Sequence, residues 1–194
     1  YGTGCFALTN TGSEIVHSNN GLLSTVAYQK DGDKPQYAIE GSVSIAGAAV
    51  QWLRDYLNII QESSEVEALA MGEKDNGDVY FVPAFSGLFS PHWDETARGV
   101  LVGLSRYSNK SHIARAVLES VAYQSNELLE SMEKDIGITF ESVNVDGGMV
   151  VNNLLMQFQS DIFNKKVISQ EINEITALGA GAASFLFINN LPLE

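Results

Sequence analysis

The sequence has few basic residues and almost no cysteine. Cys5 is the single cysteine among 194 residues, which rules out a disulfide within the chain and is typical of a protein from the reducing cytoplasm. The sequence contains 11 Lys and Arg residues and 24 Asp and Glu residues, which gives a net charge of −13 at pH 7. Such a charge repels a phosphate backbone, so nucleic-acid binding is disfavoured. A nucleotide can still bind through local backbone N–H groups.

Long apolar runs and several familiar catalytic motifs are also missing. No stretch reaches the roughly 18 consecutive apolar residues of a membrane span, and no signal-peptide pattern occurs. His17, His92 and His112 lack the spacing of metal ligands, so no zinc site is expected. The Gly-x-Ser-x-Gly and P-loop motifs are absent, which leaves hydrolase and P-loop functions without support. Cys5 fits a small buried residue better than a nucleophile.

The apolar content of 45% is enough for one domain with a core. Apolar periodicity and turn residues predict strands at 5–8, 22–28, 36–40, 79–83, 100–104, 142–145 and 166–168. They predict helices at 44–60, 64–71, 152–163 and 177–188, and a long one capped by Ser111 that ends near residue 135. We expect one α/β domain over residues 1–194, with an N-terminal antiparallel meander and a mixed sheet covered by helices. The opening strand-like run without an initiator Met suggests part of a longer protein.

A strand, a carboxylate, two glycines and the start of a helix follow one another between Val143 and Asn152. Glycines such as Gly147 and Gly148 let the backbone approach a ligand closely, and a helix N-terminus presents N–H groups to phosphate. This pattern predicts phosphate or ribose binding. An ordinary strand-to-helix turn uses the same residues, and the segment alone leaves both interpretations open.

Two shorter segments are weaker candidates for the same chemistry. The hydroxyl of Thr3 lies between two glycines and can turn toward a phosphate oxygen, although a hairpin bend would use the same residues. Gly47 and Gln51 are one helical turn apart, so the amide could reach a ribose or a base. A packing contact beside a surface polar residue explains that pair equally well. None of the acidic residues stands out as a general base.

A longer pattern resembles the FGGY family of carbohydrate kinases. Residues 99–104, followed after seven residues by 112–119, match the second signature of that family. Residues 83–99 and the 146–153 segment extend the match over virtually the whole chain. Within the family, residues 1–6 and 155–161 are more similar to glycerol kinases than to pentulose kinases.

The resemblance implies an actin-like, ribonuclease-H-like ATPase fold in which two similar domains close around ATP. This chain resembles the C-terminal one, and the N-terminal domain is absent. The resemblance assigns Thr3 to the terminal phosphates of ATP and Gly47 and Gln51 to the nucleotide cleft. It assigns Gly148 and Asn152 to the α-phosphate, ribose and adenine.

The resemblance also implies which parts of the reaction lie elsewhere. Phe6 matches an aromatic residue that packs on the carbon skeleton of glycerol. The catalytic Asp of the family precedes Tyr1, and the carboxylates that hold Mg²⁺ belong to the other domain, so no catalytic residue or metal ligand is expected here. The intact protein would be a cytoplasmic, homo-oligomeric kinase that uses ATP with Mg²⁺ to convert glycerol to sn-glycerol 3-phosphate and ADP. This chain alone would be inactive.

Two other functions fit the same residues. One is the corresponding domain of a pentulose or other polyol kinase. The other is a non-catalytic nucleotide-binding or oligomerisation module built on the same fold.

Overall fold

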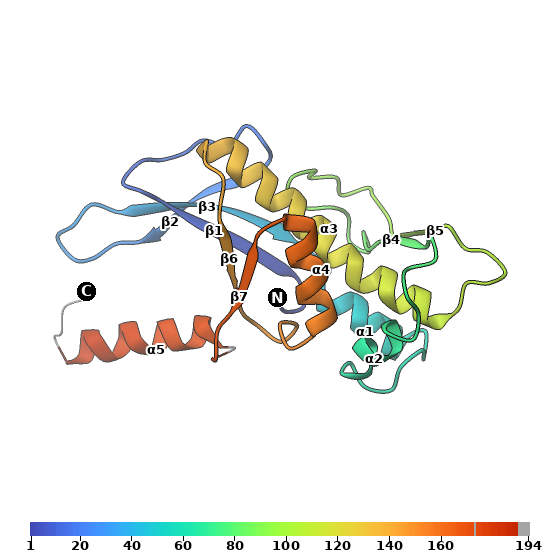
Figure 1. Cartoon of the computed structure of the whole chain (residues 1–194). Coiled ribbons are helices and arrows are strands. Elements are labelled where there is room, and N and C mark those ends of the chain that lie inside the picture. The colour runs from blue at the N-terminus through green and yellow to red at the C-terminus, as the bar shows by residue number, and fades with distance from the viewer. Residues whose placement is uncertain (173, 190–194) are drawn as a thin grey trace.

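The computed structural model describes residues 1–172 and 174–189 and has an α/β architecture (Figure 1). In chain order its elements are β1 (Cys5–Gly12), β2 (Leu23–Tyr28), β3 (Gln36–Val43), α1 (Gly47–Asp55), α2 (Glu65–Ala70), β4 (Tyr80–Val82), β5 (Val100–Val102), α3 (Lys110–Ile136), β6 (Ser142–Val145), α4 (Asn153–Phe163), β7 (Lys166–Ser169) and α5 (Ile175–Ile188). Each predicted helix and strand is present, with ends shifted by a few residues. The predicted range 1–194 includes residues 173 and 190–194, which lie outside the described residues.

The N-terminal strands form an antiparallel sheet in the order β1-β3-β2. The expected meander is therefore wrong, because β1 pairs with β3 and not with β2. Ala38 and Ile39 on β3 are fully buried, whereas most of β2 is exposed. The strand with the most buried side chains takes the centre of the sheet, and the exposed strand takes the edge.

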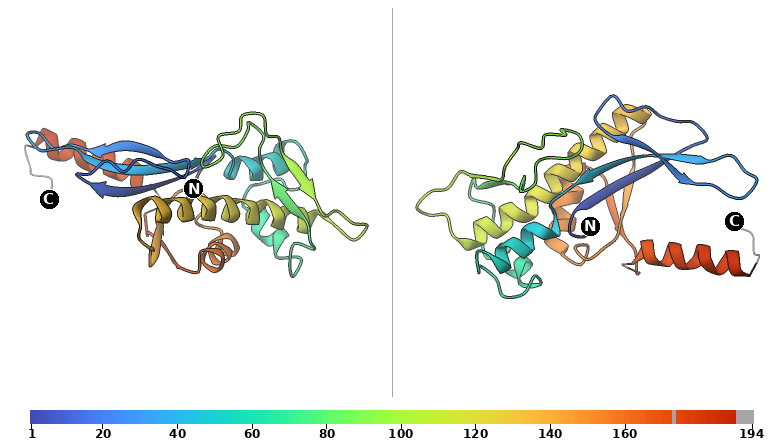
Figure 2. Two further views of the ribbon diagram at one scale, coloured as in Figure 1. Left: turned by 90° about the horizontal axis from the view of Figure 1, so that it is seen from above. Right: turned by 180° about the vertical axis from the view of Figure 1, so that it is seen from behind.

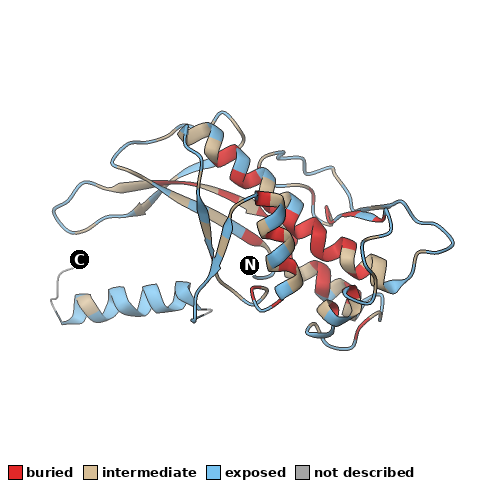
Figure 3. Ribbon diagram, in the orientation of Figure 1, coloured by how far each residue is buried: buried red, intermediate tan, exposed pale blue. Residues whose placement is uncertain are grey.

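The 27-residue helix α3 crosses the molecule (Figures 1 and 2) and contributes residues to both hydrophobic clusters of the core. Its N-terminal half, with Val117 and Leu118, packs with residues of α1, α2 and β4. Its C-terminal half, with Leu128 and Met132, packs with residues of β1 and β3. Figure 3 shows this buried stripe along α3. Each buried aliphatic side chain of this size contributes about 1.5–3 kcal/mol.

The start of α3 differs from the sequence prediction. Asn109 caps the helix in place of Ser111, because its side-chain oxygen accepts hydrogen bonds from the N–H groups of Ser111 and His112. The backbone N–H of Asn109 in turn donates to Nδ1 of His112 at 3.2 Å. A histidine thus completes a capping box that commonly uses Glu or Gln at that position.

The remaining strands form two further pairs. β4 and β5 are antiparallel, and β6 and β7 are parallel and connected through α4. Parallel and antiparallel pairing therefore both occur, as the predicted mixed sheet requires. The described residues nevertheless form three separate sheets and not a single mixed one. Helix α5 contains no buried residue, and none of the described helices is long and apolar enough to cross a membrane.

We predict that Asn109→Ala lowers the stability of the protein by about 1 kcal/mol, because the first turn of α3 loses its cap. For a domain of this size, that loss corresponds to a fall in Tm of about 2–4 °C, measurable by thermal unfolding. Asn126→Ala on the same helix is the matched control, since it removes only an exposed bond to Glu130. An equal fall in Tm for both variants would contradict a capping role.

Candidate functional site

A cavity of about 640 Å³ lies where the N-terminal turn, the start of α1 and the turn after β6 meet. This nucleotide-pocket candidate is lined by Thr3, Gly47, Gln51, Gly148 and Asn152. The structure therefore brings together all five residues that the sequence suggested as nucleotide contacts, from three distant segments. The volume lies within the range of about 300–1,000 Å³ common for small-molecule sites.

Backbone hydrogen bonds join the N-terminal turn to α1. The carbonyl oxygen of Thr3 accepts from the N–H groups of Ala46 at 2.9 Å and Ala48 at 3.0 Å. The carbonyl oxygen of Gly2 accepts from the N–H of Gly47 at 2.9 Å. These carbonyls satisfy donors at the start of α1, so these N–H groups are not available to a phosphate.

Tyr1 joins the same turn to the segment after β6. Its amino group donates to the carbonyl oxygen of Asp146 at 3.0 Å, and its carbonyl oxygen accepts from the N–H of Met149 at 3.3 Å. Gly147 has a φ of +96°, and a Cβ there would lie 2.5 Å from the carbonyl oxygen of Tyr1. The fold itself therefore requires the first of the two glycines.

The glycines that line the pocket differ in what a side chain would meet. A Cβ on Gly47 would lie 2.6 Å from the carbonyl oxygen of Gly2, so close packing of the N-terminal turn requires this glycine. A Cβ on Gly148 would meet no atom within 4 Å, and the φ of Gly148 is not in the left-handed region. The protein contacts therefore do not demand a glycine at 148, and a side chain there would extend into open space.

The start of α4 is also occupied by protein groups. Asn152 accepts a hydrogen bond from the N–H of Leu155 at 2.8 Å, and Glu67 accepts from the N–H of Leu154 at 2.9 Å. The carboxylate of Glu67 therefore occupies the N-terminus of α4, where the sequence pattern predicted a bound phosphate. This end of the pocket suits a neutral ribose or base better than an anion.

Free donors lie at the other end of the pocket. In the described part of the chain, the backbone N–H groups of Thr3 and Gly148 donate to no protein acceptor. Both residues are exposed to the cavity, and Thr3 adds a hydroxyl group. Backbone N–H groups and hydroxyls of this kind bind phosphate oxygens. Phosphates are therefore best accommodated beside Thr3 and Gly148.

Some lining residues were not suggested by the sequence. Ser63, Ser64 and Glu67 reach the pocket from α2 and the loop before it. The sequence around these three residues contains no recognisable motif. Glu67 accepts its hydrogen bond from Leu154, which lies 87 positions further along the sequence. Only the tertiary structure reveals them.

Phe6 and Cys5 lie on β1, outside this pocket. Phe6 is 80% exposed and borders a second cavity. Cys5 is buried, and burial raises the pKa of its thiol to about 12. The thiol stays protonated at neutral pH, which agrees with a packing role and not with a nucleophile. No group of three or more potential metal ligands occurs among the described residues.

Comparison with known proteins shows the family to which the chain belongs. Residues 1–185 match the family model described as the FGGY family of carbohydrate kinases, C-terminal domain. Over 97% of its length the chain is 60% identical to a glycerol kinase of Brucella anthropi and 57% identical to one of Methylobacterium radiotolerans. The chain spans 38% of the length of each of these relatives.

Solved structures show the same relationship. The crystal structure of Plasmodium falciparum glycerol kinase with ADP aligns with 93% of this chain at a TM-score of 0.85 and 43% identity, and the chain covers 36% of it. A xylulose kinase from Lactobacillus acidophilus, at a TM-score of 0.76 and 24% identity, shares the fold. These neighbours confirm the predicted α/β, actin-like ATPase class. The chain belongs to the FGGY family of carbohydrate kinases and corresponds to its C-terminal domain.

Proposed function

We propose that this chain is the C-terminal, nucleotide-binding part of a glycerol kinase, which transfers a phosphoryl group from ATP to glycerol to give sn-glycerol 3-phosphate and ADP. The observation that carries the proposal is the convergence of Thr3, Gly47, Gln51, Gly148 and Asn152 in one cavity. Identities of 57–60% to glycerol kinases support this substrate over a pentulose. The lone cysteine supports a cytoplasmic enzyme, and the family resemblance supports a homo-oligomer.

The geometry supports one orientation of the nucleotide in the pocket. The phosphates would lie beside the free N–H groups of Thr3 and Gly148, since these are donors without a protein acceptor. The ribose and base would lie toward Gln51 and Asn152, among the apolar side chains that line the rest of the cavity. Desolvation of the base against those side chains would add affinity.

The residues of the pocket do not fit a Mg²⁺ site. Glu67 is the only carboxylate among the residues that line it, and this side chain already accepts a hydrogen bond from Leu154. Mg²⁺ needs several oxygen ligands in octahedral geometry. We therefore assign the metal ligands to the part of the parent protein that this chain does not span.

In phosphoryl transfer, the residues of this chain would bind ATP and orient its phosphates. Thr3 would hold the terminal phosphates in line for attack, and such positioning carries much of the catalysis in phosphoryl transfer. The base that removes the proton from the attacking hydroxyl would be the Asp that precedes this chain in the family pattern. Phe6, exposed on β1, would offer an apolar face to the carbon skeleton of glycerol.

We predict that the 194-residue chain alone has no glycerol-dependent ATPase activity, because it lacks the base and the metal ligands. A chimera in which it replaces the matching segment of the Brucella anthropi glycerol kinase should release ADP with a kcat of about 1–10³ s⁻¹. A coupled ADP-release assay with and without glycerol measures both. A folded, glycerol-binding chimera without turnover would contradict the proposed function.

We predict that Gly148→Ala weakens ADP binding at least several-fold and leaves Tm within a few degrees, because the added methyl group projects into the pocket and meets no protein atom. For the unchanged chain we expect a Kd between high micromolar and millimolar, about −4 to −6 kcal/mol. Isothermal titration calorimetry and thermal unfolding measure the two effects.

Gly137→Ala is the matched control for this prediction. Gly137 ends α3 with a φ of +76°, and a Cβ there also meets no atom within 4 Å. Alanine is strained in that conformation by about 1–2 kcal/mol, so this variant should lose stability and keep its ADP affinity. Unchanged ADP affinity in a folded Gly148→Ala protein would remove Gly148 from the site.

A further inference from the structure

The polar residues of the family signature at 112–119 lie on one face of α3. His112, Arg115 and Glu119 are three and four positions apart, a spacing that places them above one another on a helix. Their side chains are all largely buried. None of the three is among the described residues that line the nucleotide-pocket candidate. The nucleotide contacts therefore do not explain this part of the signature.

Arg115 and Glu119 bind the segment that connects α2 to β4, at residues 71–79. Nδ2 of Asn76 donates to Oε2 of Glu119 at 2.9 Å. The guanidinium of Arg115 donates to the carbonyl oxygen of Glu73 at 3.4 Å, and its Nε donates to Oε1 of Glu119 at 2.9 Å. The ion pair on α3 thus holds the segment at two separate points.

His112 and the cap of α3 hold the same segment at the start of the helix. Asn109 donates from Nδ2 to Oε1 of Glu73 at 2.7 Å, and Nε2 of His112 lies 3.9 Å from Oε2 of that carboxylate. A Cβ on Gly77 would lie 2.5 Å from the ring of His112, so the backbone of the segment approaches α3 closely. Contacts to the segment therefore continue from the cap of α3 to Glu119.

Stability alone is a poor explanation for the buried Arg115–Glu119 pair. Burial raises the pKa of Glu119, although the hydrogen bonds from Arg115 and Asn76 oppose this shift. The loss of hydration offsets much of the attraction within a buried ion pair, and apolar residues of similar size often stabilise a fold as well. The two charges are therefore better explained by a need to fix the position of the groups that they bind.

The segment that this pair binds begins where α2 ends. Helix α2 carries Glu67 to the nucleotide-pocket candidate, where Glu67 accepts the hydrogen bond from the N–H of Leu154 at the start of α4. Leu118, which is three residues from Arg115 on α3, also lines this pocket. A small cavity is bordered by Leu118 and Leu154 together with both residues of the pair. The pair therefore lies directly behind the wall that α2, α3 and α4 form.

We propose that Arg115 and Glu119 are positioning residues, which hold α2 against the start of α4 and so set the width of the nucleotide-pocket candidate at its ribose and base end. They act through the segment 71–79 and touch no ligand. Without them α2 would move more freely, and its hydrogen bond to Leu154 would weaken. The inference rests on the proposed function, because it takes the ligand of this pocket to be a nucleotide.

The test replaces both charges at once, with Arg115→Met and Glu119→Leu in one protein. Neither charge is then left buried without its partner, so we expect this pair variant to fold with a Tm within a few degrees of that of the unchanged chain. Glu130→Leu with Lys134→Met is the matched control, since it removes an exposed ion pair with the same spacing on the same helix.

Amide hydrogen exchange of the 194-residue chain without ligand tests the structural step. In the pair variant, the amides of Glu65–Ala70 and of Leu154 should exchange about fivefold faster or more, because α2 opens more often. The control should exchange like the unchanged chain. Equal protection of α2 and Leu154 in all three proteins would overturn the proposal, whatever the pocket binds.

Steady-state kinetics of the chimera with the Brucella anthropi glycerol kinase test the effect on the site. The pair variant should raise KM for ATP about fivefold or more and leave kcat and KM for glycerol within about twofold, because only nucleotide binding depends on α2. A role in stability alone would lower kcat through the loss of active protein and leave KM for ATP unchanged, which would overturn the proposal. A chimera without turnover before any substitution contradicts the proposed function instead, and the exchange of α2 and Leu154 then decides the inference.

Asn76→Ala separates the contact with the segment from the ion pair itself. This variant leaves Arg115 and Glu119 bound to one another and removes the bond that joins Glu119 to the segment. It should speed exchange in α2 and raise KM for ATP by about twofold or more. Because it keeps both charges, it also decides the matter if the double substitution does not fold. Unchanged exchange and KM would confine the role of the pair to α3 and overturn the proposal.

Discussion

The pocket depends on the backbone hydrogen bonds that the first three residues make to two other segments. Carbonyl oxygens of Gly2 and Thr3 bind the start of α1, and Tyr1 binds the turn after β6 on both its amino and carbonyl sides. Backbone groups can approach so closely only where no Cβ intervenes, which explains Gly47 and Gly147. These contacts fix the distance between the segments, so Thr3, Gln51 and Gly148 face one cavity.

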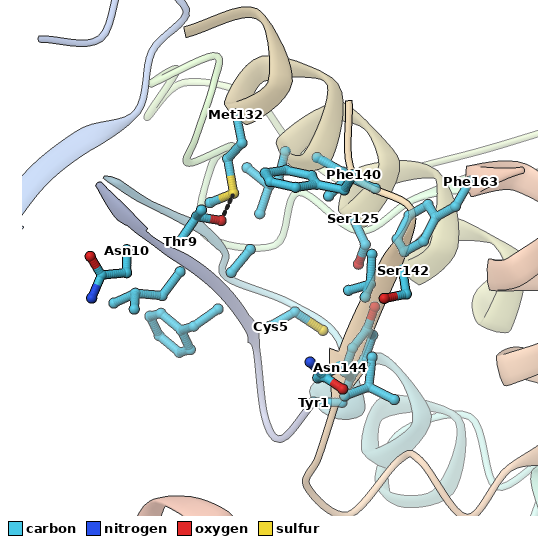
Figure 4. Close-up of a pocket in the computed structure, with 17 residues that line it drawn as sticks. Tyr1, Cys5, Thr9, Asn10, Ser125, Met132, Phe140, Ser142, Asn144 and Phe163 are labelled. Carbon is cyan, nitrogen blue, oxygen red and sulfur yellow. Dashed lines mark hydrogen bonds between the residues drawn. The ribbon is translucent and has the colours of Figure 1, made fainter. Parts of the chain in front are cut away.

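Tyr1 also connects the nucleotide-pocket candidate with the second cavity, which Phe6 borders, since Tyr1 lines both. Burial raises the pKa of its hydroxyl, so the phenol is neutral and adds no charge to either cavity. The nucleotide-pocket candidate therefore lies at the end where β1 and β6 come together, and the second cavity lies where the two strands separate (Figure 4). A ligand at a site of this kind is held by loops that the converging strands position.

The sequence predicted local elements well because their signals are local. Apolar spacing located α3, and turn residues separated the N-terminal strands. The sequence also identified five of the residues that line the pocket, through a family pattern that covers the chain. It failed where the outcome depends on distant partners, since β1 pairs with β3 and Glu67 binds the start of α4. It also misplaced one local feature, because Asn109 and not Ser111 caps α3.

The division into three sheets has the same physical origin. A strand can form from its own sequence pattern, but a sheet is complete only when each inner edge has a partner. In the described residues, β1 and β6 are each paired along one edge only. The apolar helix α5 similarly lacks a packing partner, because none of its residues is buried in the described structure. A helix that is apolar on all sides is normally buried. Residue patterns in this chain thus encode surfaces for contacts that its described residues do not supply.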